Sequence, residues 1–569
     1  MRATLHQLCR QPRLAGSPEA QLATDYIRQE FLQAGLQVES FPYLVHAPRQ
    51  TKESLAIKIA AGEWLELNLQ EQGFVEDSWS LQEARPPMHG LTKAGMATGG
   101  VVFAGFGSEQ EFAQLRKKIG GELQNCIALI RYGRLYRGLK VANAEAAGCK
   151  AALLYCDPDD DGAGRGKVLP KGKWRTASSI QRGSVFNGHG DPRTPGWASL
   201  PDAPRLSLNQ VQGLVNIPSL PISWQNAEKI FAGQGRPKLP QALATKARLE
   251  IRQDSNPVTI TNIVGRIPGK THPKEWVIVG AHRDSWGPGA IDNGTGTTVL
   301  TEIARVFGAA YRAGWQPNRS LVFASWDGEE WGLVGSTEWV EQFQSELRAH
   351  AVAYINLDVV ASGENFGASC TPGLASFITQ TCRQQGLQAP TNLGTPGGGS
   401  DHVPFLEWAG IEVAGIGFHG SSGTYHSQMD TPYVVETFLD PDFKNHEQAA
   451  RFACQLLLSL SSADTIPRAA KEWAQRAREG AGRLRGLQAT SPAWLSFFKA
   501  LDELAEMSAV INHSPALPFH QAFITADRGS LLWKSFGYGS LWFPTLSAES
   551  TAIEIAEVTA ALHQAKKSF

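Results

Sequence analysis

The sequence lacks the features that mark several classes of protein. Its 569 residues hold no run of the roughly 18–20 apolar residues that a membrane-spanning helix needs, and its first residues contain no apolar core of signal-peptide length. The chain also has no tandem repeat and no low-complexity segment. We therefore expect a globular protein that is soluble as written, and the sequence by itself leaves the natural compartment open.

Cysteine is scarce, and neither sign of charge is in excess. The seven cysteines include no Cys-x-x-Cys pair, which argues against a disulfide framework and against a thiolate zinc site. Lys and Arg number 53 and Asp and Glu 54, so the net charge of −1 gives no overall attraction for nucleic acid or for an anionic membrane. With 42 % hydrophobic and only 19 % charged residues, the composition excludes a disordered chain or a coiled coil, and the length suggests two to four domains.

The spacing of apolar residues predicts an α/β protein with a β-rich insertion. Residues 18–36 carry apolar side chains at helical spacing, and residues 37–45 are typical of a strand. Short β-rich runs around one helix follow between residues 46 and 257. Near-continuous apolar strands then alternate with helices from 258 to 465, a pattern that indicates a parallel or mixed sheet buried on both faces. Residues 466–569 are mainly helical by pattern.

Polar residues follow the apolar strands of the 258–465 segment. Ligands of open α/β sheets bind at the carboxyl ends of the strands, so we expect these side chains to converge at one edge. They are His282, Asp292, Glu329, Glu330, Asp358 and His426. Each one alone has an ordinary explanation, such as a packed histidine, an acid at a helix start or a turn residue. Those explanations would all have to hold at five strand ends, so a metal site is the better interpretation.

The residue types fit a site for two metal ions. Imidazole nitrogen and carboxylate oxygen are the ligands expected for zinc. A two-metal site needs one carboxylate to bridge, and one acid must stay off the metal to move protons. Glu329 and Glu330 are adjacent, so their side chains can point in different directions and divide these tasks.

The sequence around these residues resembles the zinc peptidase family of glutamate carboxypeptidase and the transferrin receptor. The similar segments include GAHRDSWGPGAIDNGTG, FASWDGEEWGLVGSTEW, YINLD and YHSQMDTP, and RYGRLYRGLKVANAEAAGCKAALLYCDP resembles the family's inserted protease-associated domain. The resemblance implies a zinc-exopeptidase domain with a mixed sheet over 1–45 and 258–465. It also implies a protease-associated domain over 46–257 and a helical, dimerisation-like domain over 466–569. A homodimer and an extracytoplasmic location are expected on the same basis.

The resemblance also assigns roles. His282 and Asp358 would bind one zinc ion, Glu330 and His426 would bind the other, and Asp292 would bridge the two.

Glu329 would be the general base, and Tyr425 would donate to the oxyanion of the tetrahedral intermediate. The transferrin receptor branch keeps the fold but loses ligands and catalysis. Here all five ligand positions and the base are present, so we expect an active enzyme acting on peptides rather than a silent receptor-like binding protein.

Substrate preference is predicted less directly. Arg137 matches the arginine that binds the terminal carboxylate of substrates in the carboxypeptidase branch, a role that a forked guanidinium suits. The other pocket residues implied are Ser184, Gly399, Ser400 and Tyr425. The Lys-Tyr pair of glutamate-selective members has no counterpart, so we expect a carboxypeptidase with reduced preference for acidic side chains. Candidate aromatic contacts are Trp533, Phe536 and Trp542.

Two alternatives stay open at this point. An aminopeptidase could use the same metals, but it needs an acidic group for a free α-amine and gives Arg137 no role. Thr194, Glu338 and Glu341 match the family's structural calcium site, and oxygen ligands suit calcium. An acidic helix face with i,i+3 spacing explains the two glutamates equally well.

Overall fold

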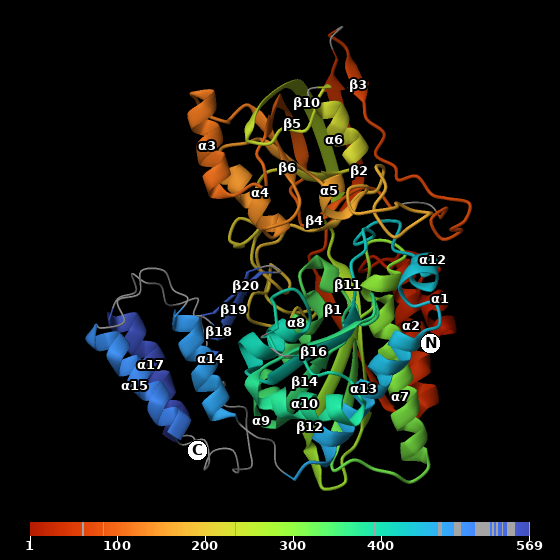
Figure 1. The fold of residues 1–569 in the computed structure, drawn as a ribbon, viewed down its shortest axis with the longest axis vertical. Helices are drawn as coiled ribbons and strands as arrows, with labels where there is room; N and C mark the ends of the chain where they lie inside the picture. Colours follow the sequence, from red (N-terminus) through yellow and green to blue (C-terminus); the bar gives the residue numbers. More distant parts are fainter. Residues whose placement is uncertain are drawn as a thin grey trace.

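The computed structural model describes residues 1–59, 62–82, 85–233, 235–390, 393–394, 396–464, 469–482, 491–506, 524–525, 529–530, 533–536, 539–542 and 552–567. Two seven-stranded sheets dominate these residues, one formed from both ends of the 1–465 region and one from its middle (Figure 1). The last helices of the chain lie beside the first sheet, at the lower left of the view. Among the described residues, no helix is both long enough and apolar enough to cross a membrane.

The first sheet is mixed, with a parallel centre and antiparallel edges. Its strands, in spatial order, are β1 (Gln37–Val45), β11 (Val258–Ile267), β13 (Arg319–Trp326), β12 (His272–His282), β14 (Ala351–Asn356), β16 (Glu412–His419) and β15 (Asn365–Cys370). The neighbours β13, β12, β14 and β16 run parallel, so their carboxyl ends meet at one edge. This confirms the predicted α/β class and its mixed sheet.

Helices cover both faces of this sheet. One apolar cluster joins the strands to α2 (Pro18–Ala34), α7 (Gly296–Arg312), α10 (Ala375–Gln384) and α13 (Lys444–Ser462). A second cluster joins them to α8 (Val334–Gln342) and α9 (Gln344–His350). Successive residues of β12 alternate between the two clusters, as the period of two in a strand requires: Val277 and Val279 lie in the first, Ile278 in the second.

Helix α2 shows how local sequence sets the ends of an element. The Ser17 side chain accepts a hydrogen bond from the Ala20 amide at its start, and Gly35, with φ of 86°, ends it in the left-handed region that glycine favours. The preceding helix is α1 (Arg2–Leu8). Shorter helical turns are η1 (Ala290–Thr295), η2 (Glu329–Trp331), η3 (Pro372–Leu374), α11 (His402–Pro404), η4 (Phe405–Ala409), α12 (Pro432–Val434) and η5 (Val435–Leu439).

The second sheet forms the insertion at the top of Figure 1. Its strands, in spatial order, are β3 (Trp64–Glu66), β2 (Arg49–Lys58), β10 (Gln241–Asp254), β5 (Gly95–Phe103), β6 (Cys126–Arg131), β7 (Ala151–Tyr155) and β9 (Ser219–Ile222). Helices α3 (Glu109–Ile119), α4 (Arg137–Ala146), α5 (Pro158–Asp161) and α6 (Trp224–Ile230) accompany it. The β6–α4–β7 unit is the predicted strand–helix–strand module. Strands β4 (His89–Gly90) and β8 (Gly183–Ser184) form a small parallel pair, and β8 contacts η2, the turn that follows β13 of the first sheet.

The C-terminal part contains α14 (Ala470–Gly482), α15 (Pro492–Glu506) and α17 (Ala552–Lys567), which share an apolar cluster around Trp473, Trp494 and Phe497. Arg476 of α14 donates to the Cys370 carbonyl and thereby ties this cluster to β15. Short strands β17 (Ile524–Thr525), β18 (Gly529–Ser530), β19 (Trp533–Phe536) and β20 (Gly539–Trp542) pair as hairpins. The side chains of the three aromatic residues proposed as substrate contacts lie outside the described residues.

Candidate active site

Six side chains meet at the carboxyl edge of the parallel strands. They belong to His282 at the end of β12, Asp292 in η1, Glu329 and Glu330 in η2 after β13, Asp358 after β14 and His426 after β16. Five are buried, and the Asp358 side chain is partly exposed. The structure therefore brings together every residue that the sequence placed at this edge.

Asp292 lies between the two histidines. Its Oδ1 is 3.3 Å from Nε2 of His282, and its Oδ2 is 3.1 Å from Nε2 of His426. Each histidine faces one further carboxylate: Asp358 Oδ1 is 3.4 Å from His282, and Glu330 Oε2 is 2.9 Å from His426. The arrangement is two nitrogen–oxygen groups that share one carboxylate.

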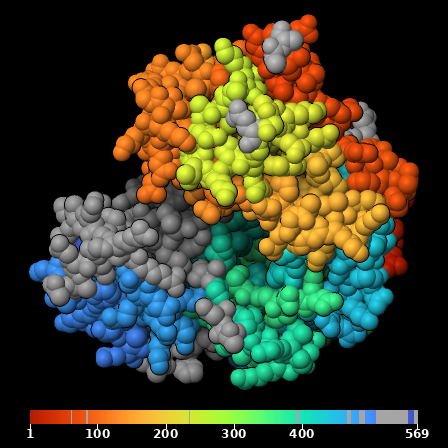
Figure 2. Space-filling view, turned by 45° about the horizontal axis from the view of Figure 1, so that its top comes forward, coloured from red at the N-terminus to blue at the C-terminus, as the bar shows by residue number. Residues whose placement is uncertain are grey.

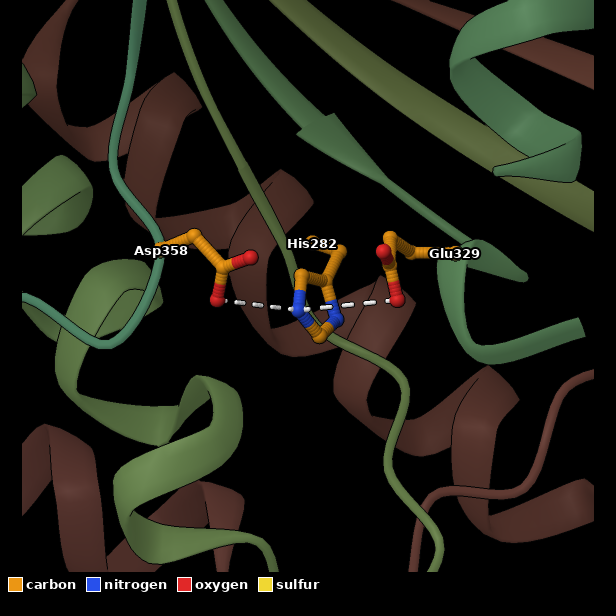
Figure 3. A group of neighbouring side chains, drawn as sticks. All are labelled: His282, Glu329 and Asp358. Atoms are coloured by element: carbon orange, nitrogen blue, oxygen red, sulfur yellow. Dashed lines mark ion pairs between the residues drawn. The ribbon is translucent and has the colours of Figure 1, made fainter. Parts of the chain in front are cut away.

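Glu329 is the most distant of the three carboxylates that lie near Nε2 of His282. Its Oε2 is 3.9 Å from Nε2 of His282, farther than the nearest oxygens of Asp292 and Asp358. Figure 3 shows the imidazole of His282 between the carboxylates of Asp358 and Glu329. Burial raises the pKa of Glu329 well above its usual value, and Glu330 raises it further against the opposing charge of His282. A raised pKa makes the carboxylate a stronger base, as a group that accepts a proton from water needs to be.

The ligand atoms form two groups by spacing alone. Atoms of His282, Glu329 and Asp358 lie within 4.8 Å of one another, as do atoms of Asp292, Glu330 and His426. Spacing therefore admits Glu329 as a ligand of the first group. The shorter distances of Asp292 and Asp358 to His282 favour those two carboxylates instead.

The donor atoms fit divalent cations. Apart from the histidines that face them, both oxygens of Glu330 and Oδ1 of Asp358 are buried with no hydrogen-bond partner among the described residues. Buried carboxylate oxygens without partners are costly, and a cation removes that cost. Burial alone would lower the pKa of His282, but Glu329 and Asp358 raise it well above its usual value. The pocket thus has an excess of negative charge, and its nitrogen and oxygen donors are those zinc prefers.

Two aspartates that sequence reasoning missed hold the ligands in place. The Asp284 carboxylate accepts from the amides of Glu329 (3.1 Å) and Glu330 (3.2 Å), and its Oδ1 is 3.5 Å from Nδ1 of His282. Asp430 accepts from the amide of Asp292 at 3.0 Å. The signal was available, because each aspartate lies two or four residues after a predicted histidine ligand, in the segments GAHRD and HSQMD. Such outer partners fix ligand orientation.

The predicted substrate residues fall into two groups. Arg137, at the start of α4, places Nη2 3.2 Å from the Tyr425 hydroxyl and 3.5 Å from Nδ1 of His426. Ser184 is fully buried, and its hydroxyl is used within the fold, accepting from the Phe186 amide at 3.2 Å. The Ser400 hydroxyl accepts at 2.8 Å from Nδ2 of Asn356, the last residue of β14. Gly399, which precedes Ser400, is exposed.

Two cavities flank Tyr425. One of about 420 Å³ is lined by the insertion residues Tyr136, Arg137 and Gln181 together with Tyr425. The other, of about 330 Å³, is lined by Asp292, Trp174 and Ser362 among others, again with Tyr425. Figure 2 shows the surface hollowed where the orange and yellow insertion meets the teal part of the chain. Both cavities are therefore lined by residues of the insertion and by residues of the part of the chain that contains the first sheet.

The predicted calcium residues also come together. The Glu338 carboxylate accepts from the amides of Asp191 (2.7 Å) and Ser199 (2.5 Å), and Glu341 accepts from the Gly196 amide at 2.8 Å. The loop that carries Thr194 is thus fastened to α8. Burial raises the pKa of Glu341 to about 8. These contacts use both oxygens of Glu338 and one of Glu341, whereas Oε2 of Glu341 and Oγ1 of Thr194 are buried with no hydrogen-bond partner among the described residues. Calcium binding stays a prediction.

Comparison with known proteins identifies the family. A model of peptidase family M28 matches residues 262–439, and a model of the PA domain matches residues 93–187. The sequence is 34 % identical over 490 residues to a probable glutamate carboxypeptidase of Arabidopsis thaliana, a match that covers 81 % of this chain and 71 % of the plant protein. The chain belongs to peptidase family M28. By family the chain is a peptidase acting on peptides, so the silent receptor-like alternative is not adopted.

Other relatives differ in the activity they are named for. The M28 peptidase is 34 % identical over 447 residues to the aminopeptidase NAALADL1 of Mus musculus, covering 67 % of this chain and 59 % of the mouse protein. Its fold is similar to that of a zinc aminopeptidase from Bacillus subtilis, with a TM-score of 0.55 at 22 % identity over 81 % of this chain and 94 % of that chain. It is also similar to an aminopeptidase from Aneurinibacillus, with a TM-score of 0.53 at 20 % identity over 82 % of this chain and 94 % of that chain.

Proposed function

We propose that this M28 peptidase is a two-zinc carboxypeptidase that releases single residues from the C-terminus of peptides. The observation that carries the two-metal part is the position of Asp292, with one oxygen toward each histidine. His282 and Asp358 would hold one ion, and Glu330 and His426 the other. When bound, the two ions would lower the pKa of a water molecule and polarise the peptide carbonyl.

The proton transfers fall to Glu329. We assign it the general base role because its carboxylate lies farther from His282 than those of Asp292 and Asp358 and has a raised pKa. It takes a proton from the attacking water and later gives it to the leaving amine. Its amide is held by Asp284, so the carboxylate is oriented before substrate binds.

Tyr425 is placed to stabilise the tetrahedral intermediate. Arg137 donates to its phenolic oxygen, so the hydroxyl hydrogen of Tyr425 is directed elsewhere and can point at the oxyanion. The side chain of Tyr425 stacks on the ring of His426 with centroids 3.6 Å apart, which keeps it beside the ligands.

The carboxypeptidase assignment rests on Arg137. It is the cation that lines the 420 Å³ cavity, and a forked guanidinium binds a terminal carboxylate well. Arg137 is the one cation among the lining residues, so a terminal carboxylate bound to it leaves no second cation there for an acidic side chain. We therefore propose substrates whose C-terminal residue has a neutral side chain, with Gly399 and Ser400 as further pocket residues. Ser184 is not proposed as a contact, because its side chain is fully buried and its hydroxyl accepts from the Phe186 amide.

An aminopeptidase is the second candidate, and two observations favour it. The mouse relative is named an aminopeptidase, and Asp160 and Asp161 also line the cavity that contains Asp292. These acids could bind an α-amine. However, Asp160 is paired with Arg131 and Asp161 with Arg175, each at 2.7 Å, so their charge is largely neutralised. The carboxypeptidase remains the function that the geometry supports best.

The remaining expectations from the sequence are kept as proposals. They are a zinc-peptidase domain over 1–45 and 258–465, an insertion over 46–257, a helical domain over 466–569 that mediates a homodimer, an extracytoplasmic location, and one calcium ion near Thr194, Glu338 and Glu341.

Paired peptides test the direction of cleavage. One peptide has an acetylated N-terminus and a free C-terminus, and its partner has a free N-terminus and an amidated C-terminus. The proposal expects stepwise loss of C-terminal residues from the first peptide only, abolished by a chelator and restored by Zn²⁺. Loss of N-terminal residues from the second peptide would establish the aminopeptidase instead.

A further inference from the structure

We propose that the buried Glu71–Arg182 ion pair of the insertion is a positioning device that fixes the backbone and ring of His426. This inference rests on the proposed two-metal function, in which His426 is a ligand. It assigns the insertion a second task besides lining the substrate cavities, namely completing one of the two metal groups.

His426 has an unusual backbone that needs support. Its φ is 58°, in the left-handed region that residues with a side chain seldom adopt. A ligand in this conformation keeps its position only when the surrounding contacts hold it there. The residue in this conformation is a histidine, within the sequence YHSQ, and not the glycine that usually adopts it.

The contacts that hold His426 come from Arg182. The Arg182 amide donates to the His426 carbonyl at 3.0 Å, and the Arg182 carbonyl lies 3.1 Å from Nδ1 of His426. Because a carbonyl oxygen only accepts, Nδ1 carries the hydrogen in this contact, which is shorter than the 3.5 Å between Nδ1 and Nη2 of Arg137. The lone pair is then on Nε2, the atom that faces Asp292 and Glu330. The backbone of Arg182 thus selects the tautomer that can bind a metal.

Arg182 is in turn fixed by its side chain. Nη1 of Arg182 is 2.7 Å from Oε2 of Glu71, and the two side chains are 1 % and 0 % exposed. The guanidinium also donates to the carbonyls of Pro86 (3.1 Å) and Arg85 (2.5 Å). A fully buried guanidinium with these partners has one orientation, which sets the position of its own backbone.

Glu71 connects the two segments directly. It accepts from the Ile180 amide at 2.9 Å, on the Arg182 side, and from the Gln428 amide at 3.2 Å, on the His426 side. One carboxylate therefore ties residues on both sides of the Arg182–His426 pairing. Loss of its charge leaves Arg182 buried without a counter-charge, which displaces the segment.

The first experiment measures metal affinity with Glu71→Gln, which keeps the shape and one oxygen acceptor. The apoprotein is titrated with Co²⁺, and affinities and d–d absorption are recorded. Wild type is expected to bind two ions. Glu71→Gln is expected to keep one ion at wild-type affinity and to bind the other at least about tenfold more weakly, with activity recovering as Zn²⁺ is raised. Glu30→Gln makes the same substitution in the partly exposed ion pair with Arg305 between α2 and α7, and it should behave as wild type.

The outcomes separate this inference from the proposed function. A wild type that binds fewer than two ions overturns the two-metal function and this inference with it. A wild type with two ions and a Glu71→Gln variant with the same two affinities overturns only the role of the ion pair. Should Glu71→Gln fail to fold, Arg182→Lys gives the same measurement, because it keeps the charge and the carbonyl but loses the fork. Arg182→Lys is expected to lower the affinity for one of the two metal ions. Unchanged affinity for both ions would overturn the inference.

Discussion

The guanidinium of Arg137 donates to the Tyr425 hydroxyl across 3.2 Å, joining the first turn of α4 in the insertion to the segment that carries His426. This contact places a fixed positive charge beside the candidate metal ligands. It also lets one arginine serve two tasks, because the same side chain lines the larger cavity and orients the phenol.

Replacing Arg137 with alanine removes the group proposed to bind the terminal carboxylate. A charge-assisted hydrogen bond contributes roughly 1.5–3 kcal/mol, so kcat/KM for peptides with a free C-terminus should fall about 10–150-fold, mainly through KM. Arg137→Lys should recover part of the loss. Steady-state kinetics on the free peptide and its C-terminal amide make the comparison, and equal losses on both would remove the carboxypeptidase argument.

Glu329→Gln should retain both metal ions and lose about 10²–10⁴-fold in kcat, because an amide cannot accept the proton from water. Its neighbour provides the matched control: Glu330→Gln should lose one ion, since Glu330 is assigned as a ligand. Metal content by mass spectrometry beside kcat distinguishes the two. A Glu329→Gln protein that is short of metal would mean that the tasks of the two glutamates are reversed.

Tyr425→Phe deletes only the hydroxyl. If that hydroxyl donates to the oxyanion, kcat should fall by roughly 10²–10³-fold while KM and metal content change little. Phenylalanine keeps the aromatic ring that stacks on His426, so the histidine stays in place. A Tyr425→Phe enzyme with wild-type kcat would show that the oxyanion is stabilised by other groups.

Lys140 predicts a pH dependence of stability away from the metal site. Its side chain is fully buried, and burial lowers its pKa to about 7, although Nζ donates to the carbonyls of Phe106 and Gly133 at 2.6 Å each. Between pH 7 and about 10.5 the unfolded chain binds more protons here than the folded chain, so this residue adds stability as pH rises. Below pH 7 the cost of the buried charge is fully present.

The test compares wild type with Lys140→Met by thermal unfolding. The wild type should gain stability relative to the variant between pH 7 and pH 9, by at most about 1.4 kcal/mol per pH unit. The contributions of the other titrating groups to the pH dependence cancel when the stabilities of the two proteins are subtracted. A stability difference that stays constant over this range would show that Lys140 keeps its ordinary pKa in the folded protein.

The sequence predicted those parts of the molecule that depend on local pattern. Strand β1 has the predicted bounds of 37–45, and helix α2 ends where Gly35 indicated. The ligand residues could be predicted because polar side chains directly after apolar strands must meet when the strands are parallel. The strand partners in the second sheet were harder to predict. Pairing of β2 with β10 joins residues about 200 positions apart. The spacing of apolar residues indicates which face of a strand is buried, but not which other strand it pairs with.

The supporting residues were missed for the same reason. Glu71 and Arg182 are 111 positions apart, and nothing near either residue in the sequence marks it as part of a buried pair. Ser184 shows the opposite case. Its place in the motif suggested a pocket residue, but its hydroxyl is occupied by the Phe186 amide and its side chain is fully buried. Resemblance located the position, and the packing decides what the side chain does there.

A zinc-edge anomalous difference map from crystals of the zinc-loaded protein would locate both metal ions and their ligands. The account predicts two peaks on either side of the Asp292 carboxylate, one beside His282 and Asp358 and one beside His426 and Glu330, with Glu329 outside bonding distance of both. A single peak, or a peak ligated by Glu329 in place of Asp358, would contradict it.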